Sequence, residues 1–528
     1  MRYLQLFLLS ALMFSPAGAA EKDRATTQIN SFLESHWTEL KISPAEPASE
    51  SDYIRRIYLD LVGRIPTRLE RKNYLADQRT DKQEHLVDQL LNSEDHIQHL
   101  TDIFDTLLMG RGSNHDYRER QNHQWRTWLE GEFRENRPWN EIVAKILMAR
   151  PKSQDERGLV WFLYERKDNA QQIAEAIAPA FFGIRIDCAQ CHDHFIATEI
   201  EQAHYWGLVA FFNRSKNTNT PNGPRVSESA IGGYTEFANL EGGSTPNFLT
   251  FFQSTTVDEA RPEKDQKQED MAELYRNPVQ PGSPRVPQFS RREKFVEEIV
   301  KQHPLIARAF VNRIWAMLLG RGIVHPFDEM DSVHPPSHPE LLDWLAEDFR
   351  QSGYNIRRLT RNIVLCRAYQ LDSRQPSGID DPATFAWYLE RPLTAEQLAR
   401  SMQLAVQGSF RNDHPLFEQL RKPLPEVLPE TISTGIAEAL FYSNNPAVNE
   451  FLKNSSGPES LISQVMKLDS SIDQVNLLCE TVYGRSAGQD EMEQVAAYLK
   501  STPSDSVRQR WEQILWALLT NAEFHFNH

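Results

Sequence analysis

Residues 51–78, "SDYIRRIYLDLVGRIPTRLERKNYLADQ", indicate the fold of the chain. Apolar side chains recur at intervals of three and four positions on both sides of Gly63, and this spacing predicts amphipathic helices rather than strands. Pro66 and Thr67 suit the start of the second helix, because proline is tolerated in a first helical turn and threonine caps it. The stretch therefore predicts two helices joined by a short turn.

The same helical spacing extends along most of the chain, and the alternation typical of strands is scarce. The exception is the segment 215–290, which begins with short β-prone pieces among Gly, Pro, Asn and Thr and continues as a charged, proline-bearing stretch. We expect a mainly α-helical protein. Its parts are a helical domain at 21–214, a small β-hairpin insert and flexible charged linker at 215–290, and a second helical domain at 291–528.

The turn at Gly63 has a counterpart near the C-terminus. "GRIPTRLE" and "GRSAGQDE" correspond at one constant offset, which aligns Gly63, Arg64 and Glu70 with Gly484, Arg485 and Glu491. Two interpretations fit: a duplicated binding unit, or a reused packing element in which the glutamate caps the turn or pairs with the arginine. We favour the packing element, because buried arginine–carboxylate pairs are a common structural device.

Residues 1–20 are typical of a secretory signal peptide. Arg2 precedes a short apolar run, and Ala17, Gly18 and Ala19 form a small-residue cleavage site. The run is shorter than the roughly 20 residues that span a bilayer, and no later segment is apolar enough to span one. We expect an exported protein, periplasmic or extracellular, that is soluble after the signal is cleaved.

The composition excludes several classes of protein. The chain has 57 Lys and Arg against 73 Asp and Glu, a net charge of −16, which opposes binding to nucleic acid or anionic lipid. Four cysteines in 528 residues do not make a disulfide scaffold, and a chain of this length buries a sufficient core without one. Cys366 and Cys479 lie in predicted amphipathic helices, where we expect buried single thiols.

The stretch "DCAQCHDHF", residues 187–195, contains a Cys-x-x-Cys-His run. Two thiols three positions apart can each add to a vinyl group of one porphyrin, and the histidine that follows can become the proximal iron ligand. We expect one covalent haem c on Cys188 and Cys191, with His192 as its proximal ligand. Asp193 and His194 would be outer groups that orient the imidazole or a propionate.

Two alternatives stay open for these residues. Cys188, Cys191 and either His192 or His194 would give three zinc ligands, with the fourth supplied by a distant segment. A redox-active thiol pair is the other, but it needs a thioredoxin-like βαβ setting, whereas the flanking sequence is helical. Haem c is the leading expectation, and zinc is the alternative cofactor.

The sixth iron position has several candidate ligands, none of which the sequence selects: Met109, Met148, His204, His334 and His338. A filled position would favour electron transfer, whereas a vacant one would permit ligand binding or peroxide chemistry.

The loop 325–338 is the other unusual stretch, because it gathers histidines and carboxylates: His325, Asp328, Glu329, Asp331, His334 and His338. One interpretation is a metal or polar substrate site that faces the haem. The other is a proline-stiffened loop in which Ser337 and Pro339 cap a helix that starts at Glu340. We favour the second.

Motifs along nearly the whole chain carry a family resemblance. The first set is "RRIYLDLVGRIPT", "FFGIRIDCAQCHDH" and "YWGLVAFFNR". The second set is "ARAFVNRIWAMLLGRGIVHPFDEM", "PPSHPELLDWLAEDF", "RPLTAEQLARSM", "NNPAVNEFL" and "WALLTNAEFHFNH". With these motifs the chain resembles exported planctomycete proteins that join a cytochrome-c-like domain of unknown function to a second, planctomycete-specific domain of unknown function.

The resemblance implies a haem-type motif at Cys188, Cys191 and His192 and assigns no biochemical role. The chain departs from the family pattern at Phe195, where members usually have proline, and at His334, where they usually have asparagine. The first departure affects the path of the loop after the motif, and the second either adds a ligand or has no consequence.

The sequence as a whole predicts a monohaem c-type redox protein. It would pass electrons to a redox partner protein or oxidise a substrate such as a carbohydrate. One alternative is a non-enzymatic helical scaffold whose Cys/His cluster holds a structural metal. Another is an enzyme that acts through the loop 325–338, with purely structural cysteines.

Overall fold

The computed structural model describes residues 17–238, 242–263, 266–276, 284–424, 427–428, 446–454, 457–501 and 506–528. It is mainly α-helical, with small two-stranded sheets, as the helical spacing predicts. Of the predicted signal peptide, residues 1–16 lie outside this part of the chain, and Ala17 begins helix α1 (Ala17–Leu40). Within the described residues, no helix has both the length and the apolar character needed to cross a membrane.

The N-terminal part is a succession of helices. Those after α1 are α2 (Glu50–Val62), α3 (Arg68–Ala76), α4 (Lys82–Leu91), α5 (Glu94–Met109), α6 (Asn114–Asn122), α7 (Trp125–Arg134), α8 (Trp139–Met148), α9 (Trp161–Tyr164), α10 (Ala170–Ile177) and α11 (Gln202–Phe212). Short 3-10 or π turns lie among them: η1 (Arg157–Val160), η2 (Ala178–Phe182) and η3 (Asp187–Gln190). Thr67 caps α3 in a capping box with Glu70, which confirms the predicted helix start.

Two antiparallel strand pairs follow α11. β1 (Ser215–Thr220) and β2 (Gly223–Glu228) form a hairpin in which Ser215 pairs with Glu228. β3 (Glu236–Ala238) and β4 (Ser244–Pro246) form a shorter pair, and the 3-10 turn η4 (Ala272–Leu274) comes later. The predicted β-hairpin insert is therefore present between the helical parts.

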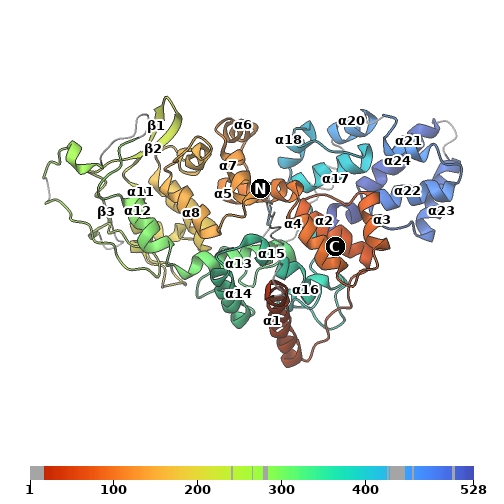
Figure 1. The fold of residues 1–528 in the computed structure, drawn as a ribbon, viewed down its shortest axis with the longest axis horizontal. Helices are drawn as coiled ribbons and strands as arrows, with labels where there is room; N and C mark the ends of the chain where they lie inside the picture. The colour runs from red at the N-terminus through yellow and green to blue at the C-terminus, as the bar shows by residue number, and fades with distance from the viewer. Residues whose placement is uncertain are drawn as a thin grey trace, which may run out of the picture.

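The rest of the chain is helical again. Its elements are α12 (Arg291–Lys294), η5 (Phe295–Val300), α13 (Pro304–Leu319), α14 (Pro339–Gln351), α15 (Ile356–Val364), α16 (Arg367–Gln370), η6 (Pro382–Thr384), α17 (Ala395–Gln407), α18 (Pro415–Arg421), α20 (Pro446–Asn454), α21 (Leu461–Val465), α22 (Ser471–Val482), α23 (Gln489–Ser501), α24 (Val507–Leu519) and α25 (Ala522–His525). β5 (Arg391–Pro392) pairs with β6 (Phe526–Asn527), so the C-terminus returns to the middle of the molecule (Figure 1).

Buried apolar side chains form two clusters whose division along the chain falls near residue 390. The first cluster draws on residues 29–257 and 295–388. The second draws on residues 393–524, together with Leu59 and Ile65. Residues 295–388 therefore share a core with the N-terminal helices. In Figure 1 α13 to α16 lie at the centre, between the β-containing end and α17 to α24.

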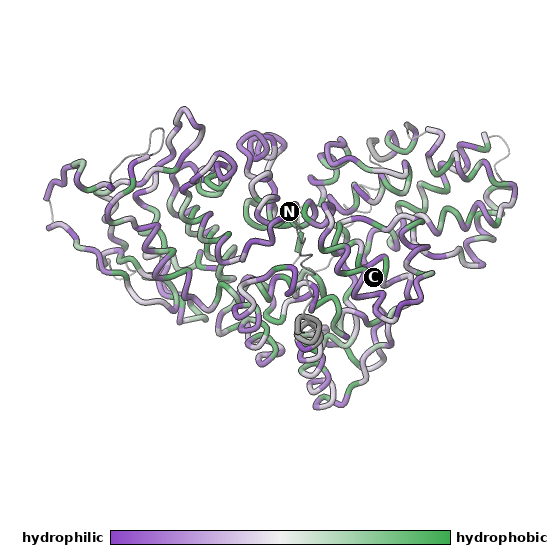
Figure 2. Tube along the Cα trace, viewed as in Figure 1, coloured by the Kyte–Doolittle hydropathy of each residue, from purple (hydrophilic) through white to green (hydrophobic). Residues whose placement is uncertain are grey.

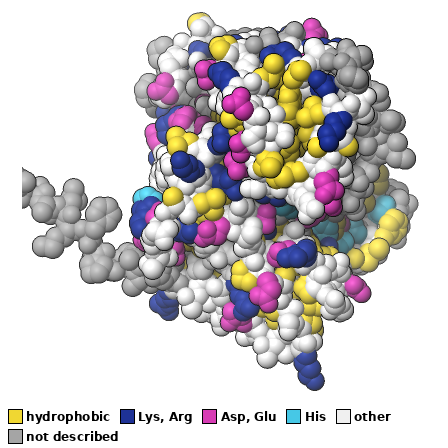
Figure 3. Space-filling model, turned by 90° about the vertical axis from the view of Figure 1, so that its right-hand side faces the viewer, with side chains coloured by type: hydrophobic (Ala, Val, Ile, Leu, Met, Phe, Trp, Pro, Cys, Tyr) yellow, Lys and Arg dark blue, Asp and Glu magenta, His cyan; other side chains and the backbone are white. Residues whose placement is uncertain are grey.

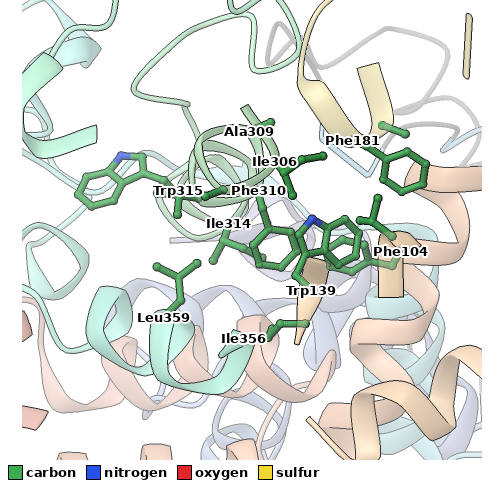
Figure 4. Close-up of a cluster of buried hydrophobic side chains, with 14 of the residues drawn as sticks. Phe104, Trp139, Phe181, Ile306, Ala309, Phe310, Ile314, Trp315, Ile356 and Leu359 are labelled. Atoms are coloured by element: carbon green, nitrogen blue, oxygen red, sulfur yellow. The ribbon is translucent and has the colours of Figure 1, made fainter. Parts of the chain in front are cut away.

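Helix α13 joins the segment that follows it to the first core. It carries buried residues along its whole length, and a helix that is apolar on most sides is driven into the interior. Its Phe310 packs against Trp139 of α8 and Phe104 of α5, with ring centroids 4.5 and 5.7 Å away. Figure 4 shows this aromatic cluster. The segment after α13 is thereby held beside the N-terminal helices.

The second core lies among α17 to α24, where apolar and polar positions mix along each helix (Figure 2). Helix α23 at this end has no fully buried residue. Figure 3 shows hydrophobic side chains gathered on this end of the molecule, with charged side chains around them. Met466, Ile472 and Val507 are exposed apolar residues of the same region.

Helix α2 contributes to both cores, since Ile54 and Ile57 belong to the first and Leu59 to the second. Its buried Arg55 donates hydrogen bonds to the carbonyl oxygens of Val482 and Phe524 at 3.2 and 3.0 Å. A buried guanidinium that donates to backbone carbonyls fixes the position of the segments that supply them. Helix α2 thus ties the C-terminal helices to the first core.

The two Gly-Arg turns have the same local structure. Their glycines take positive φ values, 68° at Gly63 and 80° at Gly484. Each arginine bonds both oxygens of the glutamate six positions later, at 2.8 or 2.9 Å: Arg64 with Glu70, and Arg485 with Glu491. The pairing expected of a reused packing element is confirmed, and it closes the turn that leads into α3 and α23.

Candidate functional site

The segment before the Cys-x-x-Cys-His motif is held by caps at both ends. The side chain of Asn169 accepts hydrogen bonds from the backbone of the first turn of α10 and so caps this helix. Gly183 ends the helical segment with φ 64°, as expected of a glycine after a helix. The motif therefore starts a few residues after a well-defined helix end.

Gly183 also contacts helix α13 and the loop 325–338. Its carbonyl oxygen accepts a hydrogen bond from the Met330 backbone N–H at 2.8 Å. A Cβ at this position would come within 2.9 Å of the Ala309 side chain, which leaves little room for any other residue. Arg313 of α13 donates hydrogen bonds to the carbonyl oxygens of Pro179 and Ala180 at 2.6 Å each. Helix α13 thus fixes where the motif begins.

The motif itself forms one surface turn. Cys188 lies in the 3-10 turn η3, and Cys191 follows with right-handed helical φ and ψ. Both thiols are free and exposed. The Gln190 carbonyl oxygen between them accepts hydrogen bonds from the side chains of Gln202 and Trp206 of α11, at 3.1 and 3.0 Å. Helix α11 thereby holds the turn through its backbone, while both thiols remain exposed.

His192 is half-buried, and its Nδ1 lies 2.7 Å from the backbone oxygen of Asp193. When Nδ1 donates its proton to that carbonyl, the lone pair of Nε2 is the one that can bind a metal. Asp193 thus orients the imidazole through its backbone. Its carboxylate instead accepts a hydrogen bond from the Gln202 backbone at 2.7 Å, and His194 Nδ1 accepts one from Ala197 at 2.9 Å.

Two large apolar side chains next to the motif are exposed. Phe195 is 79 % exposed and Ile196 is 70 % exposed. The Phe195 ring lies 4.0 Å from the His192 ring, centroid to centroid. Contiguous exposed apolar surface can mark a site that another molecule covers. At this point the family resemblance expects proline, so Phe195 enlarges the apolar surface beside His192.

The loop 325–338 packs against the segments on both sides of the motif. Arg185, three residues before Cys188, forms ion pairs with Asp328 at 3.1 Å and Glu329 at 3.2 Å. On the other side, the Glu199 carboxylate accepts hydrogen bonds from the Ser332 backbone N–H at 2.7 Å and the Ser332 hydroxyl at 2.9 Å. The two unusual stretches of the sequence are therefore neighbours, linked by Arg185 and Glu199.

Neither linking residue stands out in the sequence, because single exposed charges are common there and carry no spacing signal. Their electrostatic surroundings are distinctive only in the folded protein. Burial acts to raise the pKa of the Glu199 carboxyl, but hydrogen bonds from its own backbone and from Ser332, together with nearby His194, hold that pKa below its usual value. Glu199 therefore stays ionised at the junction of the two loops.

Within the loop 325–338, three side chains converge: Glu329, Asp331 and His334. Each offers a metal-ligating atom, and these atoms lie within 4.8 Å of one another. Among the residues that the structure describes, this is the one group of three or more His, Cys, Asp or Glu that meets this geometry. All three residues are half-buried.

Two of the five candidates for a sixth iron ligand lie in segments that contact the motif. His204 is on α11, which packs on η3, and its Nδ1 accepts a hydrogen bond from the Glu201 backbone at 3.0 Å. His334 is in the loop 325–338, where both of its ring nitrogens face carboxylates. To bind iron through Nδ1, His204 would have to give up its hydrogen bond from Glu201. His334 would have to give up a carboxylate contact to bind iron through either nitrogen.

The other three candidates pack elsewhere. Met109 and Met148 end α5 and α8 and pack against the first core. His338 is buried against His36 of α1, with ring centroids 4.1 Å apart. Helix α14 begins at Pro339 with His338 as the residue before it, and no side chain caps it.

The predicted capping by Ser337 is therefore wrong. Its hydroxyl donates instead to the Ile323 carbonyl oxygen, at 3.2 Å, because the loop folds back on the end of α13. The helix also starts one residue earlier than expected.

Cys366 and Cys479 are both buried, which confirms the expectation of single buried thiols. The predicted helical position is right for Cys479 in α22 but wrong for Cys366, which lies between α15 and α16. Burial raises the pKa of each thiol to about 12, so both stay protonated at neutral pH. A thiol in this state is a poor nucleophile and a poor metal ligand. The accessible thiols of the chain are the exposed pair in the motif.

Comparison with known protein families gives two matches. Residues 28–217 match the family model PSCyt2, described as a protein of unknown function (DUF1549). Residues 291–416 match PSD1, also described as a protein of unknown function (DUF1553). No curated protein and no solved structure matches the chain. The first match contains the Cys-x-x-Cys-His motif, and the second contains the loop 325–338.

Proposed function

We propose that this chain, in which a PSCyt2 match is followed by a PSD1 match, is an exported monohaem c-type redox protein. Cys188 and Cys191 would hold the porphyrin through thioether bonds, and His192 Nε2 would be the proximal iron ligand. Each thiol would add across a vinyl group, with sulfur and hydrogen bonded to its two carbons. Bound haem of this type supplies one-electron transfer.

The observation that carries this proposal is the state of the motif's own turn. Both thiols are exposed and free of any disulfide, so each is accessible to a vinyl group. The Nδ1 of His192 is already engaged by the Asp193 carbonyl, which directs Nε2 toward a metal. An imidazole held through its second nitrogen is the usual arrangement of a metal-binding histidine.

The apolar surface beside the motif fits a porphyrin. Phe195 and Ile196 are exposed next to His192, and a flat apolar ring attached at Cys188 and Cys191 would shield them from water. Removing apolar surface from water is worth about 25 cal/mol per Å². The exposed pair therefore gives a haem a favourable contact in addition to its covalent bonds.

The geometry favours haem over a structural zinc site. A zinc ion binds its ligand atoms at about 2.0–2.3 Å, so three zinc ligands must lie close together. In the described part of the chain, Cys188, Cys191, His192 and His194 supply no such group of three. Thioether attachment does not require the two sulfur atoms to converge, because the two vinyl groups lie at separate positions on the ring.

The test is expression of the full chain with its own N-terminus in a host that attaches haem c in the periplasm. Intact-mass measurement should show one added haem, and N-terminal sequencing should show that residues 1–20 have been removed. Cys188→Ala and Cys191→Ala should each lose a thioether bond and shift the pyridine haemochrome spectrum. Cys479→Ala, at a buried thiol outside the motif, should keep both bonds.

Two outcomes would overturn the proposal. One is matured wild-type protein with no added tetrapyrrole. The other is a colourless protein that holds one zinc ion per chain and loses it in Cys188→Ala, which would instead support a structural metal at the motif.

A further inference from the structure

The geometry points to a second site beside the motif: we propose that Glu329 and His334 bind one divalent first-row transition-metal ion, with Asp331 holding the imidazole in position. This site is separate from the proposed haem and does not depend on it. Its two carboxylates and one imidazole come from a six-residue stretch, and their metal-ligating atoms lie within 4.8 Å of one another. Mixed nitrogen and oxygen ligands of this kind suit ions such as Zn²⁺, Mn²⁺ or Fe²⁺.

The imidazole of His334 is held between the two carboxylates. Its Nδ1 lies 2.9 Å from Asp331 Oδ1, and its Nε2 lies 3.2 Å from Glu329 Oε2. A neutral imidazole has one N–H, which serves only one of these contacts and leaves a nitrogen lone pair facing a carboxylate oxygen at the other. A metal ion between His334 Nε2 and the Glu329 carboxylate would give both of these atoms a partner.

Asp331 fixes which nitrogen is available. Its Oδ1 accepts hydrogen bonds from the backbone N–H groups of Val333 and His334, at 2.9 and 3.1 Å, as well as facing His334 Nδ1. This arrangement keeps the proton on Nδ1 and leaves Nε2 as the ligand atom. A carboxylate that orients a ligating histidine in this way raises its basicity toward a metal.

Neighbouring residues hold the cluster in place. Arg185 pairs with Glu329 through Oε1 at 3.2 Å, while Oε2 is the oxygen that faces His334. The backbone N–H of Met330, within the cluster, donates to Gly183 at 2.8 Å. Asp328 adds a third carboxylate, which also pairs with Arg185. Arg185 thus pairs with two of the three carboxylates in residues 328–331, and the net negative charge of this group favours a divalent cation.

The cluster uses other residues than the proposed haem ligands, but it lies beside the loop that follows the Cys-x-x-Cys-His motif. Ser332, between Asp331 and His334, bonds Glu199 from the loop that follows the motif. A metal ion at this cluster would therefore stabilise the contact between the two loops. Its ligands are nevertheless different from Cys188, Cys191 and His192, so each site can be removed without the other.

The test uses the full-length Cys188→Ala/Cys191→Ala variant, which carries neither haem nor motif thiols. After treatment with a chelator, titration calorimetry with Zn²⁺ should show one ion bound per chain. His334→Asn and Glu329→Gln should each weaken the binding at least tenfold. His115→Asn, at an exposed histidine on α6, and Asp413→Asn, at an exposed carboxylate, should leave it unchanged.

Circular dichroism of each variant confirms folding, and Glu329→Gln provides the result if His334→Asn does not fold. Zn²⁺ binding that is absent, or as strong in both variants as in the parent protein, overturns the proposal. Because the tested protein lacks the motif thiols, this result is independent of whether wild-type protein carries haem. A failure of the haem proposal would leave a positive zinc titration standing.

Discussion

Asp60 of α2 and Arg391 of β5 form a buried ion pair, although 331 positions separate them. Arg391 Nη2 lies 2.7 Å from each carboxylate oxygen of Asp60. The same carboxylate accepts hydrogen bonds from Tyr369 at 2.8 Å and from Asn527, next to the C-terminus, at 2.7 Å. Asp60 therefore joins an N-terminal helix, the segment between the two cores and the end of the chain.

Loss of Arg391 should destabilise the fold severely. Arg391→Met would leave the Asp60 carboxylate buried without its cation, which costs about 3–5 kcal/mol in free energy of unfolding. Arg374→Met is the matched control, because Arg374 pairs with Asp372 with its own side chain 87 % exposed. Such a surface pair contributes about 0–1 kcal/mol. Urea unfolding followed by circular dichroism measures both, and equal losses would contradict the role given to Asp60.

The two turn glycines should differ in their tolerance of a methyl group. Gly63→Ala and Gly484→Ala both place alanine at positive φ, which costs about 1–2 kcal/mol. At Gly63 the new Cβ would also overlap the buried His99 ring, whereas at Gly484 the nearest atom outside the turn is 4.0 Å away. We expect Gly63→Ala to cost a further 1–3 kcal/mol, roughly the range for overpacking. Thermal unfolding compares the two, and a larger loss at Gly484 would refute this expectation.

Stability should fall as the pH decreases below about 6.5. Burial lowers the pKa of four histidines, to about 4 at His96, His338 and His525 and to about 3 at His99. Between the unfolded value near 6.5 and these folded values, the unfolded chain binds more protons than the folded one. The stability that these histidines contribute is therefore complete above pH 6.5 and is lost progressively as the pH falls toward 4.

Each buried histidine should add about 1.4 kcal/mol per pH unit to the slope in this window. His96→Gln keeps a donor for the Leu61 carbonyl oxygen, which lies 2.7 Å from His96 Nδ1, and should reduce the slope by about that amount. His115→Gln, at an exposed site, should not change it. Denaturant unfolding at a series of pH values gives the slope, and an unaltered slope in His96→Gln would exclude this histidine as a source.

Phe195→Ser should act on the proposed haem rather than on the fold. The Phe195 side chain is mostly exposed, so its loss from the haem-free protein should change the unfolding free energy by less than about 0.5 kcal/mol. In the matured protein the substitution should lower the reduction potential, because water near the haem stabilises the more highly charged oxidised state. Leu69→Ser, at another exposed apolar side chain, is the control. Spectroelectrochemical titration measures the reduction potential of each variant. A potential that stays constant or rises in Phe195→Ser would contradict a contact between Phe195 and the haem.

Much of the local structure could be predicted from the sequence. Thr67 and Asn169 cap helices as their side chains suggest, and Gly183 ends one. The paired arginine and glutamate of the two Gly-Arg turns were also visible as a repeated pattern. These features depend on hydrogen bonds between residues a few positions apart, so the sequence contains both partners. The start of α14 was misplaced, because the contact of Ser337 with Ile323 is made across a loop.

The two candidate sites also differ in how far the sequence alone predicts them. The Cys-x-x-Cys-His spacing predicts a site at Cys188, Cys191 and His192, because its residues are close together in the sequence. The position of the loop 325–338 against the motif could not be predicted. Arg185 and Asp328 are 143 positions apart, and so are brought together only by the packing of α13 on η2.

The sequence by itself determined the helical class, the helix caps and the motif, whereas only the tertiary structure decided where the two cores divide and which loops meet. Helical spacing shows that one side of α13 or α2 is apolar and must be buried. It does not show which other segment covers that side, since burial of apolar surface is non-directional and many partners satisfy it equally. The choice is made by shape and by specific long-range pairs such as Asp60 with Arg391, which exist only once the chain has folded.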